Sequence, residues 1–133
     1  THRGIVVNRS LETSAANVYA LGDCAEVDGH VLYYVSPLMA SARALAQTLT
    51  GSPTEVYYGA MPVMVKTTLF PVAVNPPARD AEGDWHIEAK NENGVKALFR
   101  DHSGALLGFA LTGECVKEKE TLAKSVGPIM QSK

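Results

Sequence analysis

A glycine and an aspartate follow an apolar run near the start of the chain. The run is Val18–Leu21, and Gly22 and Asp23 come directly after it. We expect a buried strand that ends at the glycine, which places the Asp23 carboxylate where ligands bind in open α/β sheets. An ionised carboxylate only accepts hydrogen bonds, so it suits a ligand with sugar-like hydroxyl groups. The alternative is a hairpin strand that ends in a Gly-Asp turn and binds nothing.

A second candidate for chemistry is Lys66, which stands among apolar residues. Val63–Val65 precedes it, and Leu69 and Phe70 follow it closely. A charge in such surroundings is often functional, or it extends its ammonium group into water along an apolar surface. The alternation of a strand equally allows a lysine that faces solvent. Both interpretations of Lys66 stay open.

A helix must follow the glycine turn. Ser36 and Pro37 mark its start, because serine is a preferred N-cap residue and proline fits the first turn. Gly51 marks its end, as glycine does just past many helices. Apolar residues recur between them at helical spacing, at Leu38, Met39, Ala42, Leu45, Ala46 and Leu49. The many small side chains predict close packing against a sheet or a ligand.

The second half of the chain is rich in strand patterns. Residues 52–61 form a boundary with Gly, Ser, Pro and Tyr. After it we predict strands at residues 63–67, 70–75, 85–89, 95–100 and 105–112. Asn93-Gly94 predicts a two-residue hairpin turn. A closing helix over residues 117–126 turns its apolar side inward, at Leu122, Ala123 and Val126.

These elements predict an α+β fold in two parts. Residues 1–52 contain extended pieces, a loop and a helix, as the tail of an α/β domain does. Residues 53–133 form a small antiparallel sheet with a C-terminal helix.

Composition excludes several classes of function. The chain has 133 residues, 46% of them apolar, and a net charge of −2, which argues against a protein that binds nucleic acid by neutralising phosphates. No apolar run is long enough to span a bilayer, and no secretory signal is visible. Cys24 and Cys115 form no C-x-x-C pair, which favours unpaired thiols in the cytoplasm. The histidines show no metal-ligand spacing, so we expect no metal site.

Two sets of motifs resemble a known family. Residues 13–23 read T-S-x-x-x-V-Y-A-x-G-D, which resembles the second flavin-binding motif of flavoproteins with two dinucleotide domains. Longer stretches are similar to the rubredoxin–NAD⁺ reductases and their flavorubredoxin-reductase relatives: ANVYALGDCAEVDG, PLMASARALAQTLTG and MPVMVKTTLFPVAVNPP, with DWHIE and GFALTGE. The resemblance covers nearly the whole chain.

The resemblance implies a flavoenzyme that passes electrons from NAD(P)H through FAD to rubredoxin, a small iron protein. Residues 1–52 would then be the C-terminal remnant of the FAD-binding domain, and residues 53–133 a C-terminal domain of the interface type. No G-x-G-x-x-G turn is present, although each pyrophosphate needs one. We therefore expect the end of a larger enzyme, which by itself is inactive, lacks FAD and pairs into homodimers.

The resemblance also assigns roles to particular residues. Asp23, after Gly22, matches the position that holds the ribityl chain of FAD. The helix that begins near Pro37 would direct its positive end at the pyrimidine edge of the flavin, with free N–H groups at Leu38 and Met39. Lys66 would face the isoalloxazine ring as the candidate catalytic residue. The alternative for the helix is that it begins there only to pack on the sheet.

The partner surface and the acceptor leave alternatives open. A basic rim near the flavin would steer an acidic rubredoxin, with Arg43, Lys66, Lys96 and Arg100 as candidates, although each can equally be an ordinary solvated charge. The acceptor of a related enzyme would be a ferredoxin, nitrite or oxygen. A cofactor-free interaction or dimerisation module is the alternative from a different class.

Overall fold

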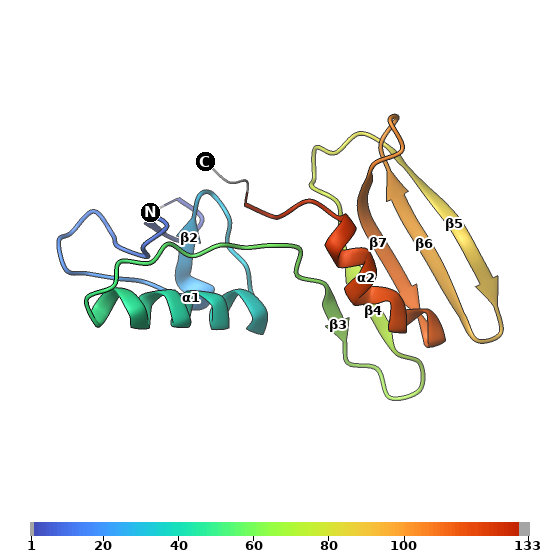
Figure 1. Ribbon diagram of the computed structural model, residues 1–133, viewed down its shortest axis with the longest axis horizontal. Coiled ribbons are helices and arrows are strands. Elements are labelled where there is room, and N and C mark those ends of the chain that lie inside the picture. The colour runs from blue at the N-terminus through green and yellow to red at the C-terminus, as the bar shows by residue number, and fades with distance from the viewer. Residues whose placement is uncertain (1, 131–133) are drawn as a thin grey trace. The chain divides into compact units, whose positions relative to one another are not determined.

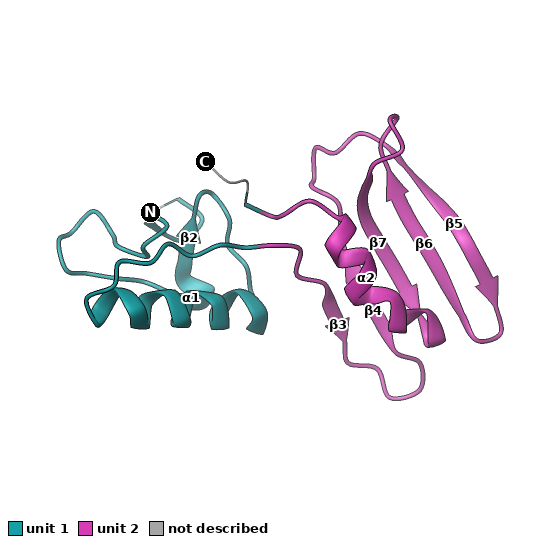
Figure 2. Cartoon of the chain, in the orientation of Figure 1, with its two compact units in different colours: residues 1–58, 130–133 teal, residues 59–129 magenta. Residues whose placement is uncertain are grey.

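The computed structural model describes residues 2–130, which form two compact units (Figure 2). The first unit runs to Tyr58 and includes Met130, and the second is Gly59–Ile129. The chain divides after Tyr58 rather than after residue 52. The reason is that the segment before Tyr58 packs with the first unit, where Val56 N donates a hydrogen bond of 2.8 Å to Arg9 O.

The first unit has two short parallel strands and one long helix (Figure 1). Strand β1 (Ile5–Val7) pairs with β2 (Ala25–Val27), so that Ile5 lies opposite Ala25 and Val7 opposite Val27. A short 3-10 helix, η1 (Gly22–Cys24), leads directly into β2. Helix α1 (Val35–Leu49) follows. The predicted order of strand, loop and helix is confirmed.

The segment before η1 differs from the predicted buried strand. Val18 is 50% exposed, and only Tyr19 forms a bridge, to Glu12 in an antiparallel sense. Thr13 N donates to Val18 O at 2.8 Å, so the segment is one arm of a narrow hairpin. Asp23 therefore lies in η1, ahead of β2, and not at the carboxyl end of a regular strand. The local alternative of a hairpin that ends in a Gly-Asp turn describes this backbone better.

Helix α1 begins earlier than predicted and buries a different face. Tyr34 is its N-cap residue and Ser36 lies inside it, whereas the end agrees with the sequence, since Gly51 follows with φ +93°. The buried residues are Pro37, Ser41, Ala44 and Leu45. Of the predicted apolar positions only Leu45 is among them. The small face turns inward, where a buried tyrosine supplies a hydrogen-bond partner for Ser41.

The second unit is a five-stranded antiparallel sheet with one helix (Figure 1). Its strand order is β3-β4-β7-β6-β5. The bounds are β3 Val63–Val65, β4 Val72–Asn75, β5 Asp84–Asn91, β6 Gly94–Arg100 and β7 Leu106–Thr112. A 3-10 segment, η2 (Gly113–Glu118), precedes helix α2 (Lys119–Ser125). The predicted α+β class is confirmed, with an antiparallel sheet and a helix at its end.

The core of the second unit lies between the sheet and its closing helix. Phe109 and Leu111 have no exposed surface, and Leu98 is 1% exposed. Each such side chain contributes about 1.5–3 kcal/mol when it leaves water. Leu122, Ala123 and Val126 pack against this cluster. Their predicted inward orientation is confirmed, although the helical turn begins as 3-10 geometry rather than as one continuous α-helix.

Gly94 has a different role from the one the sequence predicted. It is the first residue of β6, opposite Asn91, so Glu92 and Asn93 form the hairpin loop. A Cβ on Gly94 would lie 2.2 Å from Thr112 O, closer than any real contact. The glycine is therefore needed because another backbone approaches it, rather than for the turn.

We expect Gly94→Ala to destabilise the second unit by about 1–3 kcal/mol, because the new methyl group must displace the β7 backbone. Urea unfolding followed by the fluorescence of Trp85 measures this, since the only tryptophan lies in β5. Gly127→Ala is the matched control, because nothing lies within 4 Å of a Cβ there. Equal stability of the two variants would contradict the close approach at Gly94.

Candidate functional site

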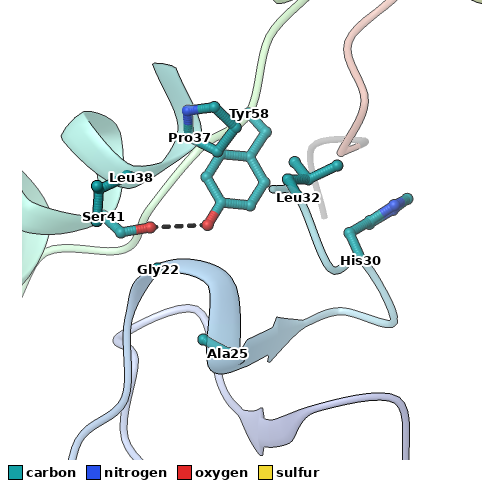
Figure 3. Close-up of a pocket in the computed structure, with 8 residues that line it drawn as sticks. All are labelled: Gly22, Ala25, His30, Leu32, Pro37, Leu38, Ser41 and Tyr58. Atoms are coloured by element: carbon teal, nitrogen blue, oxygen red, sulfur yellow. Dashed lines mark hydrogen bonds between the residues drawn. The ribbon is translucent and has the colours of Figure 1, made fainter. Parts of the chain in front are cut away.

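The candidate site of the first unit combines η1 with the first turn of α1 (Figure 3). Gly22 adopts φ +80°, a left-handed conformation that favours glycine. A Cβ on Gly22 would lie 3.2 Å from Leu38 Cδ1, so η1 packs closely on the first turn of the helix. The cavity between them is about 10 Å³. That space is too small for an organic ligand, so η1 and α1 simply pack against each other there. Any ligand must bind on the outer surface.

Asp23 lies on the exposed side of this contact between η1 and α1. Its side chain is exposed, and it forms no hydrogen bond or ion pair with any residue between 2 and 130. The carboxylate oxygens therefore remain available as acceptors for a ligand. Gly22 allows the backbone turn that precedes Asp23, and it has no side chain that could contact a ligand.

The N-terminus of α1 is open to a ligand, although not at the two N–H groups that the sequence suggested. No side chain caps the helix at Tyr34, and the first turn has no acidic residue. Because α1 begins at Val35, the N–H groups without an intrahelical acceptor precede Pro37. In α-helical pairing the N–H groups of Leu38 and Met39 donate to carbonyls one turn back. These two residues instead present side chains that are 36% and 44% exposed.

A buried pair of hydroxyl groups lies beneath the helix. Ser41 Oγ and Tyr58 Oη are 2.7 Å apart, and both residues are buried. Burial raises the pKa of the Tyr58 phenol, an effect that the hydrogen bond to Ser41 opposes. Burial likewise raises the pKa of Tyr34, with a smaller contribution from Tyr58 nearby. The tyrosine ring lines the same cavity as Gly22 and Pro37 (Figure 3).

A buried carboxylate lies in β2, the strand that follows η1. Glu26 Oε2 in β2 accepts hydrogen bonds from Arg3 N at 2.8 Å and Gly4 N at 3.0 Å. Its Oε1 lies 3.1 Å from His2 Nδ1. The Arg3 N–H is the main reason why the pKa of Glu26 lies below its ordinary value, with His2 and Gly4 adding to the effect against burial. This carboxylate ties the chain that enters β1 to the strand that follows η1.

Lys66 belongs to the second unit, directly after β3. It is exposed, and among the described residues it has no ion-pair partner. Its neighbours Leu69 and Phe70 are also exposed, at 94% and 43%. The solvent-facing alternative describes its surroundings, and its role toward a flavin stays a prediction.

Two of the four candidate steering cations are already paired. Lys96 Nζ lies 2.8 Å from a Glu118 oxygen and 3.4 Å from a Glu88 oxygen, and the Glu118 contact is the main cause that raises the pKa of Lys96. Arg100 lies 3.2 Å from Glu88 and holds the pKa of that carboxyl low. Neighbouring carboxylates thus partly neutralise these two residues, and the basic rim itself stays a prediction. Arg43 in α1 and Lys66 remain exposed.

Sequence reasoning missed the residues that support the site from inside. Ser41 stood among the small residues of the helix, Tyr58 in what was interpreted as a turn, and Glu26 was not considered. The available signal was a carboxylate between two apolar residues, Ala25 and Val27, since buried charges need partners. Nothing in the sequence pairs Ser41 with Tyr58, because that contact spans two separate segments.

Comparison with known proteins identifies the family. Residues 55–126 match the family described as the rubredoxin binding C-terminal domain. The chain belongs to this family. The match covers more than half of the chain and almost the whole second unit. The resemblance drawn from the sequence motifs is thereby confirmed.

The curated relatives that this chain matches are much longer proteins. The Rubredoxin-NAD(+) reductase of Alcanivorax borkumensis is 62% identical over 130 residues, which cover 98% of this chain and 34% of the relative. The Rubredoxin-NAD(+) reductase of Acinetobacter baylyi is 47% identical over 127 residues, covering 95% of this chain and 32% of the relative. The chain thus spans about a third of the length of these relatives.

A solved structure shows the same fold. The NADH:rubredoxin oxidoreductase of Clostridium acetobutylicum aligns with a TM-score of 0.75 at 19% identity, over 95% of this chain and 33% of that protein. Within residues 2–130, no helix has the length and apolar character needed to cross a membrane. The same part of the chain contains no group of three or more His, Cys, Asp or Glu placed to hold a metal ion.

Glu26 makes the first unit sensitive to acid. Its pKa is lowered by folding, so its stabilisation is complete above the ordinary value of 4.5 and is lost as the pH falls through the lower folded pKa. We expect Glu26→Gln to weaken β1–β2 pairing at neutral pH and to flatten the pH dependence below 4.5. Amide hydrogen exchange at β1 and β2 measures both effects. Glu55→Gln, at an exposed position, is the control, and an unchanged acid response in Glu26→Gln would contradict the assignment.

Proposed function

We propose that this chain is the C-terminal part of an FAD-dependent NAD(P)H:rubredoxin reductase, which passes electrons from reduced nicotinamide through the flavin to rubredoxin. The match of residues 55–126 to the rubredoxin-binding family carries this proposal. Two relatives named Rubredoxin-NAD(+) reductase, which match almost the whole chain, support it. The free thiols of Cys24 and Cys115 favour a cytoplasmic location.

The first unit fits one side of a flavin. Asp23 offers an exposed acceptor without a partner among residues 2–130, and the uncapped N-terminus of α1 offers donors and partial positive charge. Leu38 and Met39 add exposed apolar side chains beside these polar groups. An amphipathic ligand with hydroxyl groups and a ring that gains negative charge suits this combination. Flavin is such a ligand.

Each of these residues then has a defined task. When bound, FAD supplies the hydride and single-electron chemistry. Asp23 accepts a hydrogen bond from a ribityl hydroxyl group, and Gly22, which has no side chain, leaves room for the ligand at this turn. The N-terminus of α1, which begins at Val35, would stabilise the negative charge of reduction, and Leu38 and Met39 would shield that charge from water.

The second unit supplies the surface for the partner. Its sheet forms a packed core of its own, so it can present a surface without rearranging. Lys66 is one of its exposed cations and has exposed apolar neighbours, and we assign it the flavin-facing role that the resemblance implies. Lys96 and Arg100 contribute less to steering, because neighbouring carboxylates neutralise them.

Asp23→Asn tests the flavin site in the flavoprotein that carries this chain. The substitution keeps the shape of the side chain and removes its charge, so the ribityl hydroxyl loses a charge-assisted acceptor worth about 1.5–3 kcal/mol. We expect FAD to dissociate at least about tenfold more readily. Equilibrium dialysis followed by flavin fluorescence measures this. Glu55→Gln on the same unit is the matched control, and equal flavin retention in both variants would remove the role of Asp23.

The acceptor decides between the proposed function and the related reductases. With NADH or NADPH as donor, we expect kcat/KM of the same flavoprotein to be higher for rubredoxin than for a ferredoxin, nitrite or oxygen. Steady-state assays with each acceptor measure this preference. A preference for ferredoxin would favour the related-reductase alternative. A colourless protein without donor oxidation would favour a cofactor-free module. That the 133-residue chain alone is inactive, lacks FAD and dimerises stays a prediction.

A further inference from the structure

Tyr58 forms hydrogen bonds inside the first unit through both its side chain and its backbone. Its hydroxyl group shares a hydrogen bond of 2.7 Å with Ser41 Oγ of α1. Its carbonyl oxygen accepts a hydrogen bond of 3.0 Å from Met130 N. Tyr58, Ser41 and Met130 are 4%, 2% and 1% exposed. These bonds therefore form away from water, where a hydroxyl group left without a partner is costly.

The tyrosine ring stands where the two candidate flavin-binding elements meet (Figure 3). It lines the small cavity together with Gly22 of η1 and Pro37 and Leu38 of the first turn of α1. Ser41 lies four residues after Pro37, so both project from the same face of the helix. The bond from Tyr58 to Ser41 thus holds the face of α1 that begins at its N-terminal turn.

Helix α1 and η1 pack closely against each other. A Cβ on Gly22 would already crowd Leu38 at 3.2 Å. Glycine at position 22 therefore lets η1 lie close to the first turn of α1, and the hydroxyl pair opposes movement of α1 away from the body of the unit. The position of the helix N-terminus relative to η1 thus depends on Tyr58 and on Gly22.

We propose that Tyr58 is a positioning residue for the flavin, which acts through Ser41 to hold the N-terminus of α1 at a fixed place relative to η1. This inference rests on the proposed flavoprotein function. The stabilisation of a reduced, negatively charged flavin depends on its distance from the positive helix end. A loosened helix stabilises that charge less and makes the flavin midpoint potential more negative.

A first experiment tests the hydrogen bond between Tyr58 and Ser41 in the 133-residue chain itself, without any flavin. We expect Tyr58→Phe and Ser41→Ala each to accelerate amide exchange in α1 by about three- to tenfold, the value of one buried hydrogen bond. The double variant should exchange little faster than either single one, because both remove the same bond. Tyr57→Phe is the matched control, since Tyr57 is 51% exposed. Strictly additive effects of the two substitutions on amide exchange, or no effect, would overturn the proposed role of this hydrogen bond.

A second experiment tests the consequence in the longer flavoprotein. At full flavin occupancy we expect Tyr58→Phe to make the midpoint potential more negative and to weaken FAD binding by about three- to tenfold, whereas Tyr57→Phe does neither. Ser41→Ala must reproduce both changes, and it serves alone if Tyr58→Phe does not fold. A purely structural tyrosine would lower thermal stability and leave the potential unchanged, which overturns this inference alone. A parent protein that binds no FAD overturns the proposed function together with it.

Discussion

The buried hydrogen bond between Ser41 and Tyr58 is the constraint on which the first unit depends. Its two strands have three residues each and form only a two-stranded parallel sheet. Parallel sheets of this size do not hold together by themselves. The hydroxyl pair attaches α1 to the segment that leaves the unit, and Glu26 attaches the segment that enters it. These buried polar contacts join the segments around a small apolar core, which includes Leu11, Val27 and Met130.

The second unit is stabilised in a different way. Its sheet and closing helix enclose fully buried apolar side chains such as Phe109 and Leu111. Backbones approach each other closely around this core, and glycine at Gly94 leaves the space they need. Some of its charged groups pair with one another on the surface, as Lys96 does with Glu88 and Glu118. The result is a self-contained scaffold, which suits a domain that binds another protein.

This contrast explains how the proposed function is divided between the units. The first unit packs η1, which carries the acceptor Asp23, against the first turn of α1, so both elements are available to a bound cofactor. The packed second unit keeps its own shape and carries the exposed Lys66 between exposed apolar residues. Electron transfer through a flavin to a protein partner needs both properties in one molecule, a preorganised cofactor site and a firm docking surface.

The sequence by itself determined the family, the α+β class, the strands of the second unit and the end of α1 at Gly51. These depend on local chemistry, since alternation, turn residues and motif spacing are properties of neighbouring residues. Only the tertiary structure decided where Asp23 lies, which face of α1 is buried and which cations are free. Tyr58 and Ser41, or Lys96 and Glu118, are distant in sequence, and local periodicity carries no record of partners that meet only after folding. Helix α1 buries the face that carries Ser41, Ala44 and Leu45, and only the folded chain brings Tyr58 to that face.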